Sequence, residues 1–188
     1  KSNIYQWQIQ SVKSRFGSWF VMMCGSDNKE NSELKGHPYL DESGKAVKVN
    51  NVYDSNNEMT EIGIGYMTED FIRIGNISAD EGRFPKNDDE VAIDWNTLLE
   101  LNLGSSLGQE VEISTVIADE KGQTESITRT YKLTGILKSY TNSWAGGSHV
   151  PGVIVTEQAA QDIKRNNNAI YIYTVDDYVN DYEAIYEG

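Results

Sequence analysis

The stretch from Glu81 to Ile93, EGRFPKNDDEVAI, carries the strongest fold signal in this sequence. A Gly-Arg-Phe-Pro turn leads through a polar, acidic loop into a short apolar run that predicts a strand. Asp94 follows as a helix N-cap, because its side chain can accept a hydrogen bond from the first helical turn. The leucines of residues 98–101 predict that helix, and we expect Gly104 to close it. LGSSLGQEVEI, residues 103–113, then opens the next strand.

Residues 111–117 and 127–133 alternate between apolar and polar side chains and predict an antiparallel hairpin. The segment Asp119-Glu120-Lys121-Gly122 makes the turn between them. The other predicted strands are 17–24, 47–53, 61–66, 153–155 and 170–175, and a turn at 41–44 precedes the second of them. The other predicted helices are 4–12, 28–35, 69–74, 157–164 and 178–185. Thr68 caps the helix at 69–74, and Thr156 caps the helix at 157–164. Strands outnumber helices, so we predict an α+β fold with mixed or antiparallel sheets.

Charge limits the partners of this chain. Its 188 residues include 29 acidic and 16 basic side chains, which gives a formal net charge of −13. Nucleic acids bind to Lys and Arg, so we expect no nucleic-acid partner, and anionic lipid surfaces are disfavoured for the same reason. A cationic peptide would be attracted, but acidity also keeps a secreted domain soluble. Composition leaves both interpretations open.

Catalytic and metal-binding patterns are weak. Cys24 is the single cysteine, and the two histidines, His37 and His149, lie far apart beside turns. Acidic clusters such as Asp88-Asp89-Glu90 lack the alternating ligands and the glycine of a calcium loop. We find no nucleophile elbow and no phosphate-binding loop. The sequence therefore predicts no enzyme activity, no cofactor and no metal site.

Membrane-spanning segments are not predicted either. The longest apolar run, Trp19 to Cys24, is far shorter than the roughly 20 residues that a membrane helix needs. The chain begins at Lys1 without a start methionine. We therefore expect a soluble piece of a longer protein.

The order of the segments from Glu81 onward resembles the extracytoplasmic domain of MacB/FtsX-like ABC transporter permeases. In that family a Gly-Arg-x-Pro-x-x-x-x-Glu segment precedes a helix and a Leu-Gly-x-x-x-Gly turn. Further segments that resemble the family are RFGSW (15–19), LKGHPYL (34–40), IGIGY (62–66) through Phe71, and YKLTGI (131–136). The resemblance therefore extends over most of the chain.

The resemblance implies a non-catalytic domain on the outer face of the cell membrane. Its partners would be a cytoplasmic ATPase subunit, a second permease copy, and a peptide, lipoprotein or external protein. The domain would couple ATP hydrolysis to export or sensing, or regulate the external partner. By analogy, about 17–52 with 170–188 would form a membrane-proximal lobe, and about 62–155 an inserted distal lobe. The last strand of the proximal lobe would lie beyond Gly188.

The candidate partner-binding segment is the loop from Tyr140 to Pro151. Gly146 and Gly147 give its backbone freedom, while Tyr140 and Trp144 are amphipathic aromatics of the kind enriched at interfaces. Alternatively, Trp144 folds back onto the domain. A secreted carbohydrate- or cell-wall-binding module, with Trp144 stacked on sugar, is the main alternative function. A purely structural, adhesin-like domain is a third.

Overall fold

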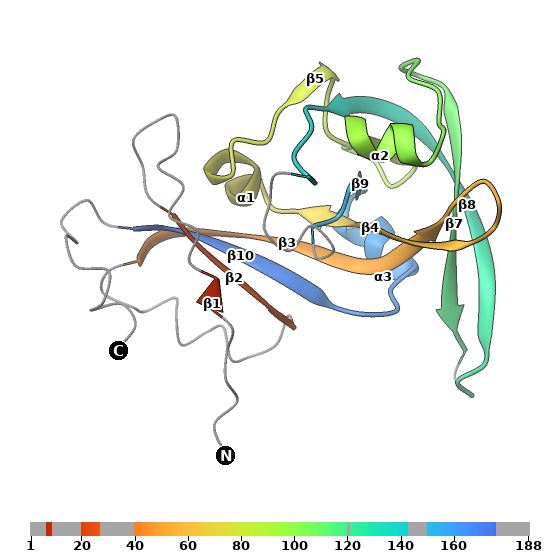
Figure 1. Cartoon of the computed structure of the whole chain (residues 1–188), viewed down its shortest axis with the longest axis horizontal. Coiled ribbons are helices and arrows are strands. Elements are labelled where there is room, and N and C mark those ends of the chain that lie inside the picture. The colour runs from red at the N-terminus through yellow and green to blue at the C-terminus, as the bar shows by residue number, and fades with distance from the viewer. Residues whose placement is uncertain (1–6, 9–19, 27–39, 120, 143–149, 176–188) are drawn as a thin grey trace.

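The computed structural model describes residues 7–8, 20–26, 40–119, 121–142 and 150–175, and Figure 1 shows their arrangement. The strands are β1 (Trp7–Gln8), β2 (Phe20–Ser26), β3 (Leu40–Tyr53), β4 (Met59–Met67), β5 (Ala79–Gly82), β6 (Glu90–Asp94), β7 (Glu110–Ala118), β8 (Thr124–Leu137), β9 (Val153–Ile154) and β10 (Asn168–Val175), and the helices are α1 (Glu69–Ile74), α2 (Trp95–Glu100) and α3 (Glu157–Asp162). The predicted α+β class is confirmed.

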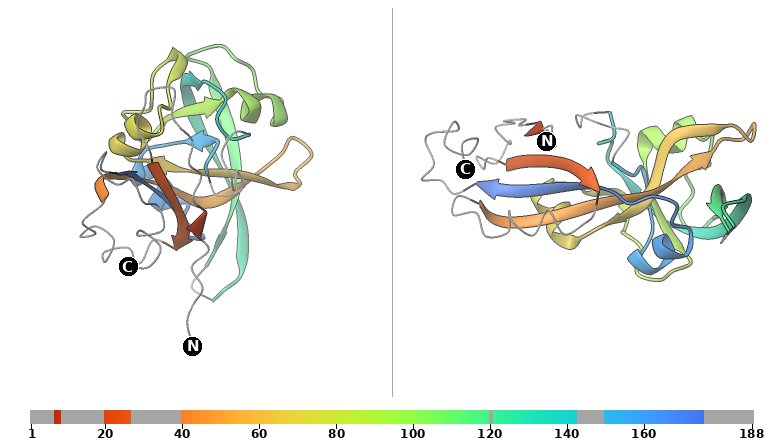
Figure 2. Two further views of the ribbon diagram at one scale, coloured as in Figure 1. Left: turned by 60° about the vertical axis from the view of Figure 1, so that its left-hand side comes forward. Right: turned by 90° about the horizontal axis from the view of Figure 1, so that it is seen from below.

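All of these strands join one mixed sheet. Its order is β1-β2-β10-β3-β4-β9-β6-β8-β5, and β7 pairs with β8. β10 lies between β2 and β3 and is antiparallel to both, whereas β4–β9 and β6–β8 are parallel pairs. In Figures 1 and 2, β2, β10 and β3 lie side by side at one end, and the β7–β8 hairpin lies at the other. The division into two lobes stays a prediction, since the sheet is continuous between these ends.

Two apolar clusters hold the sheet and the helices together. One contains Leu98 of α2 and Ile163 at the end of α3, together with Val91, Ile93 and other strand residues. The other contains Phe71 of α1, packed with residues such as Ile170 and Ile172 of β10. The three helices are too short to be stable in isolation, so burial of these side chains is what keeps them folded.

The predicted turn at 41–44 is wrong, because β3 already begins at Leu40. Ser43 pairs with Tyr173, and Gly44 pairs with Ile172 of β10. Gly44 lies directly under α1: a Cβ atom there would be 2.1 Å from the backbone nitrogen of Phe71. Gly44 therefore allows the helix to approach the strand closely, and it does not form a turn.

Helix α2 ends differently from our expectation. Asn102 adopts a left-handed φ of 53°, and the N–H of Leu103 donates to the carbonyl of Leu98 at 2.9 Å. This is the Schellman arrangement, with asparagine in the position that glycine most often takes. Gly104 does not close the helix; its carbonyl accepts a hydrogen bond from the Gln109 side chain.

Other local predictions are confirmed. Thr68 and Thr156 cap α1 and α3 through their side chains, and β7 and β8 form the predicted hairpin. The side chain of Asp119 accepts from Lys121 N and Gln123 N at 2.9 and 2.7 Å, which fixes the turn. The predicted strands at 47–53, 61–66, 153–155 and 170–175 correspond to β3, β4, β9 and β10, while 17–24 is confirmed from Phe20 as β2.

Predictions near the chain ends have mixed outcomes. Trp7–Gln8 is a strand that pairs with β2, where we expected a helical face across 4–12. The predicted helices at 28–35 and 178–185 lie outside the described residues. Within the part of the chain that the structure describes, no helix is long and apolar enough to span a membrane.

Candidate functional site

The loop that begins at Tyr140 has a firmly bonded base. Tyr140 is only 5% exposed, and its backbone N–H donates to Oδ2 of Asp94 at 2.8 Å. Its hydroxyl donates to the carbonyl of Pro151 at 2.6 Å, which ties one end of the loop to the other. The ring therefore fills the base of the loop, and little of it remains for contact with a partner.

Asp94 connects three elements at this base. It is fully buried at the end of β6, and its Oδ1 caps α2 by accepting the N–H of Thr97 at 3.0 Å. The same oxygen accepts the hydroxyl of Thr141 at 3.0 Å. A buried carboxylate is tolerated when its oxygens are saturated with donors, as they are here. Asp94 was predicted as the N-cap, but its bonds to the loop are visible only in the structure.

Burial, and secondarily the nearby Asp94 carboxylate, raises the pKa of Tyr140 well above its ordinary value of 10. The phenol therefore stays protonated throughout the physiological range. A protonated hydroxyl can keep donating to the Pro151 carbonyl throughout that range.

The exit of the loop is equally constrained. Val150 is 1% exposed, and Gly152 donates to the carbonyl of Gly63 and accepts from Asp94 N, both at 3.0 Å. A Cβ atom at Gly152 would lie 2.1 Å from Oγ1 of Thr97, so only glycine fits without rearrangement. Trp144, the other predicted contact residue, lies outside the described residues, and its role stays a prediction.

The Gly-Arg-Phe-Pro segment is held by an ion pair with Glu90. The Arg83 guanidinium donates to both oxygens of Glu90, at 2.8 and 2.7 Å, and the Lys86 and Asn87 N–H groups donate at 2.8 and 3.2 Å. These donors, Arg83 first, hold the pKa of Glu90 well below its ordinary value of 4.5. The ion pair closes the loop from Arg83 to Glu90. The Gly-Arg-x-Pro-x-x-x-x-Glu pattern of residues 82–90 therefore provides the two charged residues that hold this loop.

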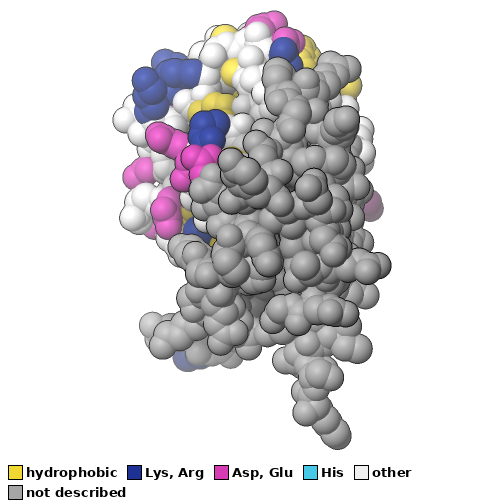
Figure 3. All heavy atoms as spheres, turned by 90° about the vertical axis from the view of Figure 1, so that its left-hand side faces the viewer, with side chains coloured by type: hydrophobic (Ala, Val, Ile, Leu, Met, Phe, Trp, Pro, Cys, Tyr) yellow, Lys and Arg dark blue, Asp and Glu magenta, His cyan; other side chains and the backbone are white. Residues whose placement is uncertain are grey.

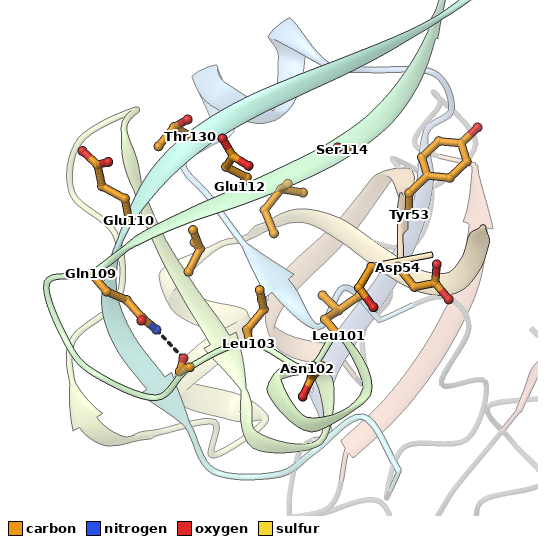
Figure 4. A pocket seen from close by; sticks show the side chains of 14 residues that line it. Tyr53, Asp54, Leu101, Asn102, Leu103, Gln109, Glu110, Glu112, Ser114 and Thr130 are labelled. Atoms are coloured by element: carbon orange, nitrogen blue, oxygen red, sulfur yellow. Dashed lines mark hydrogen bonds between the residues drawn. The ribbon is translucent and has the colours of Figure 1, made fainter. Parts of the chain in front are cut away.

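A groove of about 600 Å³ lies beside β7 (Figure 4). Residues 109–114 and Thr130 line it along the hairpin, residues 101–104 line the opposite side, and residues 53–55 lie at one end. Sequence reasoning did not identify this groove, because its walls come from three segments that are far apart along the chain.

Charge on the face shown in Figure 3 is mixed rather than uniformly basic. In the view of Figure 3, acidic and basic side chains of the described residues lie next to one another. Among the described residues, no group of three or more His, Cys, Asp or Glu side chains is arranged to hold a metal ion.

No protein-family model and no curated protein matches this sequence. Solved structures do match. A domain of a protein assigned as a permease from Porphyromonas gingivalis has a TM-score of 0.50 at 11% identity, covering 88% of this chain and 78% of that one. The periplasmic region of MacB from Actinobacillus actinomycetemcomitans has a TM-score of 0.47 at 12% identity, with 88% and 79% covered. The extracellular domain of the noncanonic ABC-type transporter YknZ from Gram-positive bacteria has a TM-score of 0.48 at 12% identity, with 87% and 78% covered.

The similarity to the Porphyromonas gingivalis permease domain, at 11% identity, concerns the fold alone. The predicted resemblance to the external domains of permeases is thereby confirmed at the level of the fold.

Proposed function

We propose that this chain is a non-catalytic extracytoplasmic domain of an ABC transporter permease. The observation that carries the proposal is the Gly-Arg-x-Pro-x-x-x-x-Glu segment, residues 82–90, on a fold similar to a permease domain. Its segment order resembles that of MacB/FtsX-like permeases, and the Arg83–Glu90 ion pair supplies a physical reason for the spacing.

The proposed partners follow from this role. A cytoplasmic ATPase subunit would act through the membrane part of the permease, and a second permease copy would complete the transporter. Outside the membrane, the domain would meet a peptide, a lipoprotein or another external protein, either as substrate or as regulated partner. Such coupling needs a stiff domain that moves as a unit, and the continuous sheet suits this requirement.

The first experiment is purification of the full-length gene product from membranes in mild detergent. We expect an ATPase subunit to co-purify in stoichiometric amount, with ATP hydrolysis that depends on the permease. A full gene without any membrane segment, or a membrane protein that retains no ATPase, would contradict the proposal.

We further propose that the loop 140–151 contacts the external partner through Trp144. Its base is held by the hydrogen bonds of Tyr140 to Asp94 and to the Pro151 carbonyl, and recognition residues often lie on loops anchored on such a scaffold. In the full-length protein we expect Trp144→Ala to abolish partner binding or substrate-dependent ATP hydrolysis while the melting temperature of the domain stays unchanged. Leu99→Ala, which truncates a side chain that is 73% exposed on α2, is the matched control and should leave binding intact.

Two outcomes would overturn the role of Trp144. One is a large loss of stability in Trp144→Ala, which would show that the indole packs inside the domain. The other is glycan or peptidoglycan binding that Trp144→Ala removes, which would instead favour a carbohydrate- or cell-wall-binding module.

A further inference from the structure

The β7 strand has an open edge along the groove. Leu133 N donates to Gln109 O at 2.9 Å, so odd-numbered residues of β7 exchange hydrogen bonds with β8. Even-numbered residues therefore point their N–H and C=O groups away from β8. Val116 confirms this alternation, because its carbonyl accepts from Asn50 Nδ2 at 2.8 Å on the outer side.

From Glu110 to Ser114 this outer edge is unoccupied by any described strand. The N–H groups of Glu112 and Ser114 point outward, and no hydrogen-bond acceptor for them is found among the described residues. The groove lies along this same stretch, since consecutive residues 109–114 line it. Unpaired donors and acceptors at a sheet edge are a template for another extended segment.

The two sides of the β7 strand differ in chemistry. Val111 and Ile113 are each 4% exposed and lie on one face, with Leu101 across the groove. Glu110 and Glu112 are exposed and lie on the other face. A strand added to this edge would alternate in the same way, with every second side chain beside the apolar residues and the others beside the carboxylates.

The charge of the groove favours basic side chains at the positions beside the carboxylates. The acidic residues that line the groove are Asp54, Glu110 and Glu112, and its lining contains no Lys or Arg. Glu112 lies opposite Thr130 in the hairpin, whereas Glu110 lies opposite Lys132. Glu112 is therefore the carboxylate best placed for an incoming cation, and the net charge of −13 would steer a cationic segment to the domain.

We infer that this groove binds an extended segment of another polypeptide, with alternating apolar and basic side chains, by adding it as a strand to β7. Main-chain hydrogen bonds to Glu110, Glu112 and Ser114 hold the added strand, and the alternation of its side chains sets the register. Apolar side chains lie beside Val111 and Ile113, and basic side chains lie beside Glu112. This inference depends on the groove alone and does not require the transporter role.

The probe is a blocked hexapeptide, Val-Lys-Val-Lys-Val-Lys, titrated into the 188-residue chain and followed by amide NMR shifts. We expect the shifts to concentrate at residues 110–114. The isomer Val-Val-Val-Lys-Lys-Lys has the same composition without alternation, and Val-Glu-Val-Glu-Val-Glu has the opposite charge. Each should bind at least about tenfold more weakly, and binding of the basic peptide should weaken as salt shortens the screening length.

Two proline variants separate strand addition from general attraction. Ser114→Pro removes an outward N–H on the groove side, whereas Thr128→Pro removes one on the opposite edge of the hairpin. The two residues are cross-strand partners and share one hydroxyl hydrogen bond of 2.7 Å, so both variants lose it equally. We expect Ser114→Pro to weaken binding at least about tenfold and Thr128→Pro to change it by less than about twofold.

If Ser114→Pro does not fold, Glu112→Lys tests the same site through charge and should lower affinity at least about tenfold. Equal binding of the basic and acidic peptides, or equal binding by wild type and Glu112→Lys, would overturn the inference. So would absence of binding by wild type, or dimerisation of wild type that Ser114→Pro prevents, because that result would assign the edge to a second copy of this chain.

Discussion

At the scale of single residues, Asp94 contributes more than its position in the sequence suggests. One buried carboxylate caps α2 and fixes the start of the loop at Tyr140 and Thr141. Each of these bonds satisfies a donor that would otherwise lack an acceptor. Loss of the carboxylate would therefore affect the helix and the loop together.

We predict that Asp94→Ala lowers the free energy of unfolding by about 2–4 kcal/mol, because it removes an N-cap and leaves buried donors unpaired. Asp94→Asn keeps one acceptor oxygen and should lose less. Chemical denaturation of both variants at neutral pH measures the difference. Equal losses in the two variants would show that the acceptor oxygen retained in Asp94→Asn adds nothing, which would contradict the capping role of Oδ1.

A pH dependence follows from Glu90. Its pKa in the folded protein lies well below 4.5, so its contribution to stability is present above the unfolded-state value of about 4.5 and is lost as pH falls from there toward the folded-state value. We predict that Glu90→Gln is less stable than wild type at pH 7 and that the gap narrows at pH 3. Urea denaturation across this range tests it.

Glu81→Gln, an exposed substitution in the same segment, is the control for Glu90→Gln and should have little effect at either pH. A gap between wild type and Glu90→Gln that is the same at pH 7 and pH 3 would contradict the proposed ion pair with Arg83.

At the scale of elements, the contact between α1 and β3 depends on the absence of a side chain. A Cβ atom at Gly44 would lie 2.1 Å from Phe71 N and 2.5 Å from its Cα, both of them backbone atoms that cannot turn aside. Phe71 is fully buried under this contact. Helix and strand can therefore approach only with glycine at position 44.

We predict that Gly44→Val lowers the free energy of unfolding by about 3 kcal/mol, since it forces α1 away from the sheet and exposes Phe71. Ser43→Val places the same side chain on the opposite face of β3 and should change stability by less than about 0.5 kcal/mol. Thermal and chemical denaturation compare the two. Comparable losses in both would show that the strand itself, rather than the contact with α1, is sensitive.

At the scale of the whole molecule, the sheet runs without a break from β1 to β5 and carries both proposed contact regions. The start of the loop 140–151 is anchored on Asp94, whereas the groove beside β7 is lined by residues 53–55, 101–104 and 109–114 and by Thr130. Two contact regions would let the domain bind an external partner at one of them and a further polypeptide segment at the other. The experiments on Trp144 and Ser114 test these regions independently.

Several local elements of this protein follow from the sequence alone. Thr68, Asp94 and Thr156 mark helix starts, and alternation around Asp119 marks the hairpin, because caps and turns act between residues close along the chain. Tertiary structure alone decided that β3 begins at Leu40, since its first residues pair with β10, more than a hundred positions away. It also decided the parallel pairs, the second role of Asp94 and the groove. These depend on which distant segments meet, and burial and strand pairing across the whole chain select that arrangement.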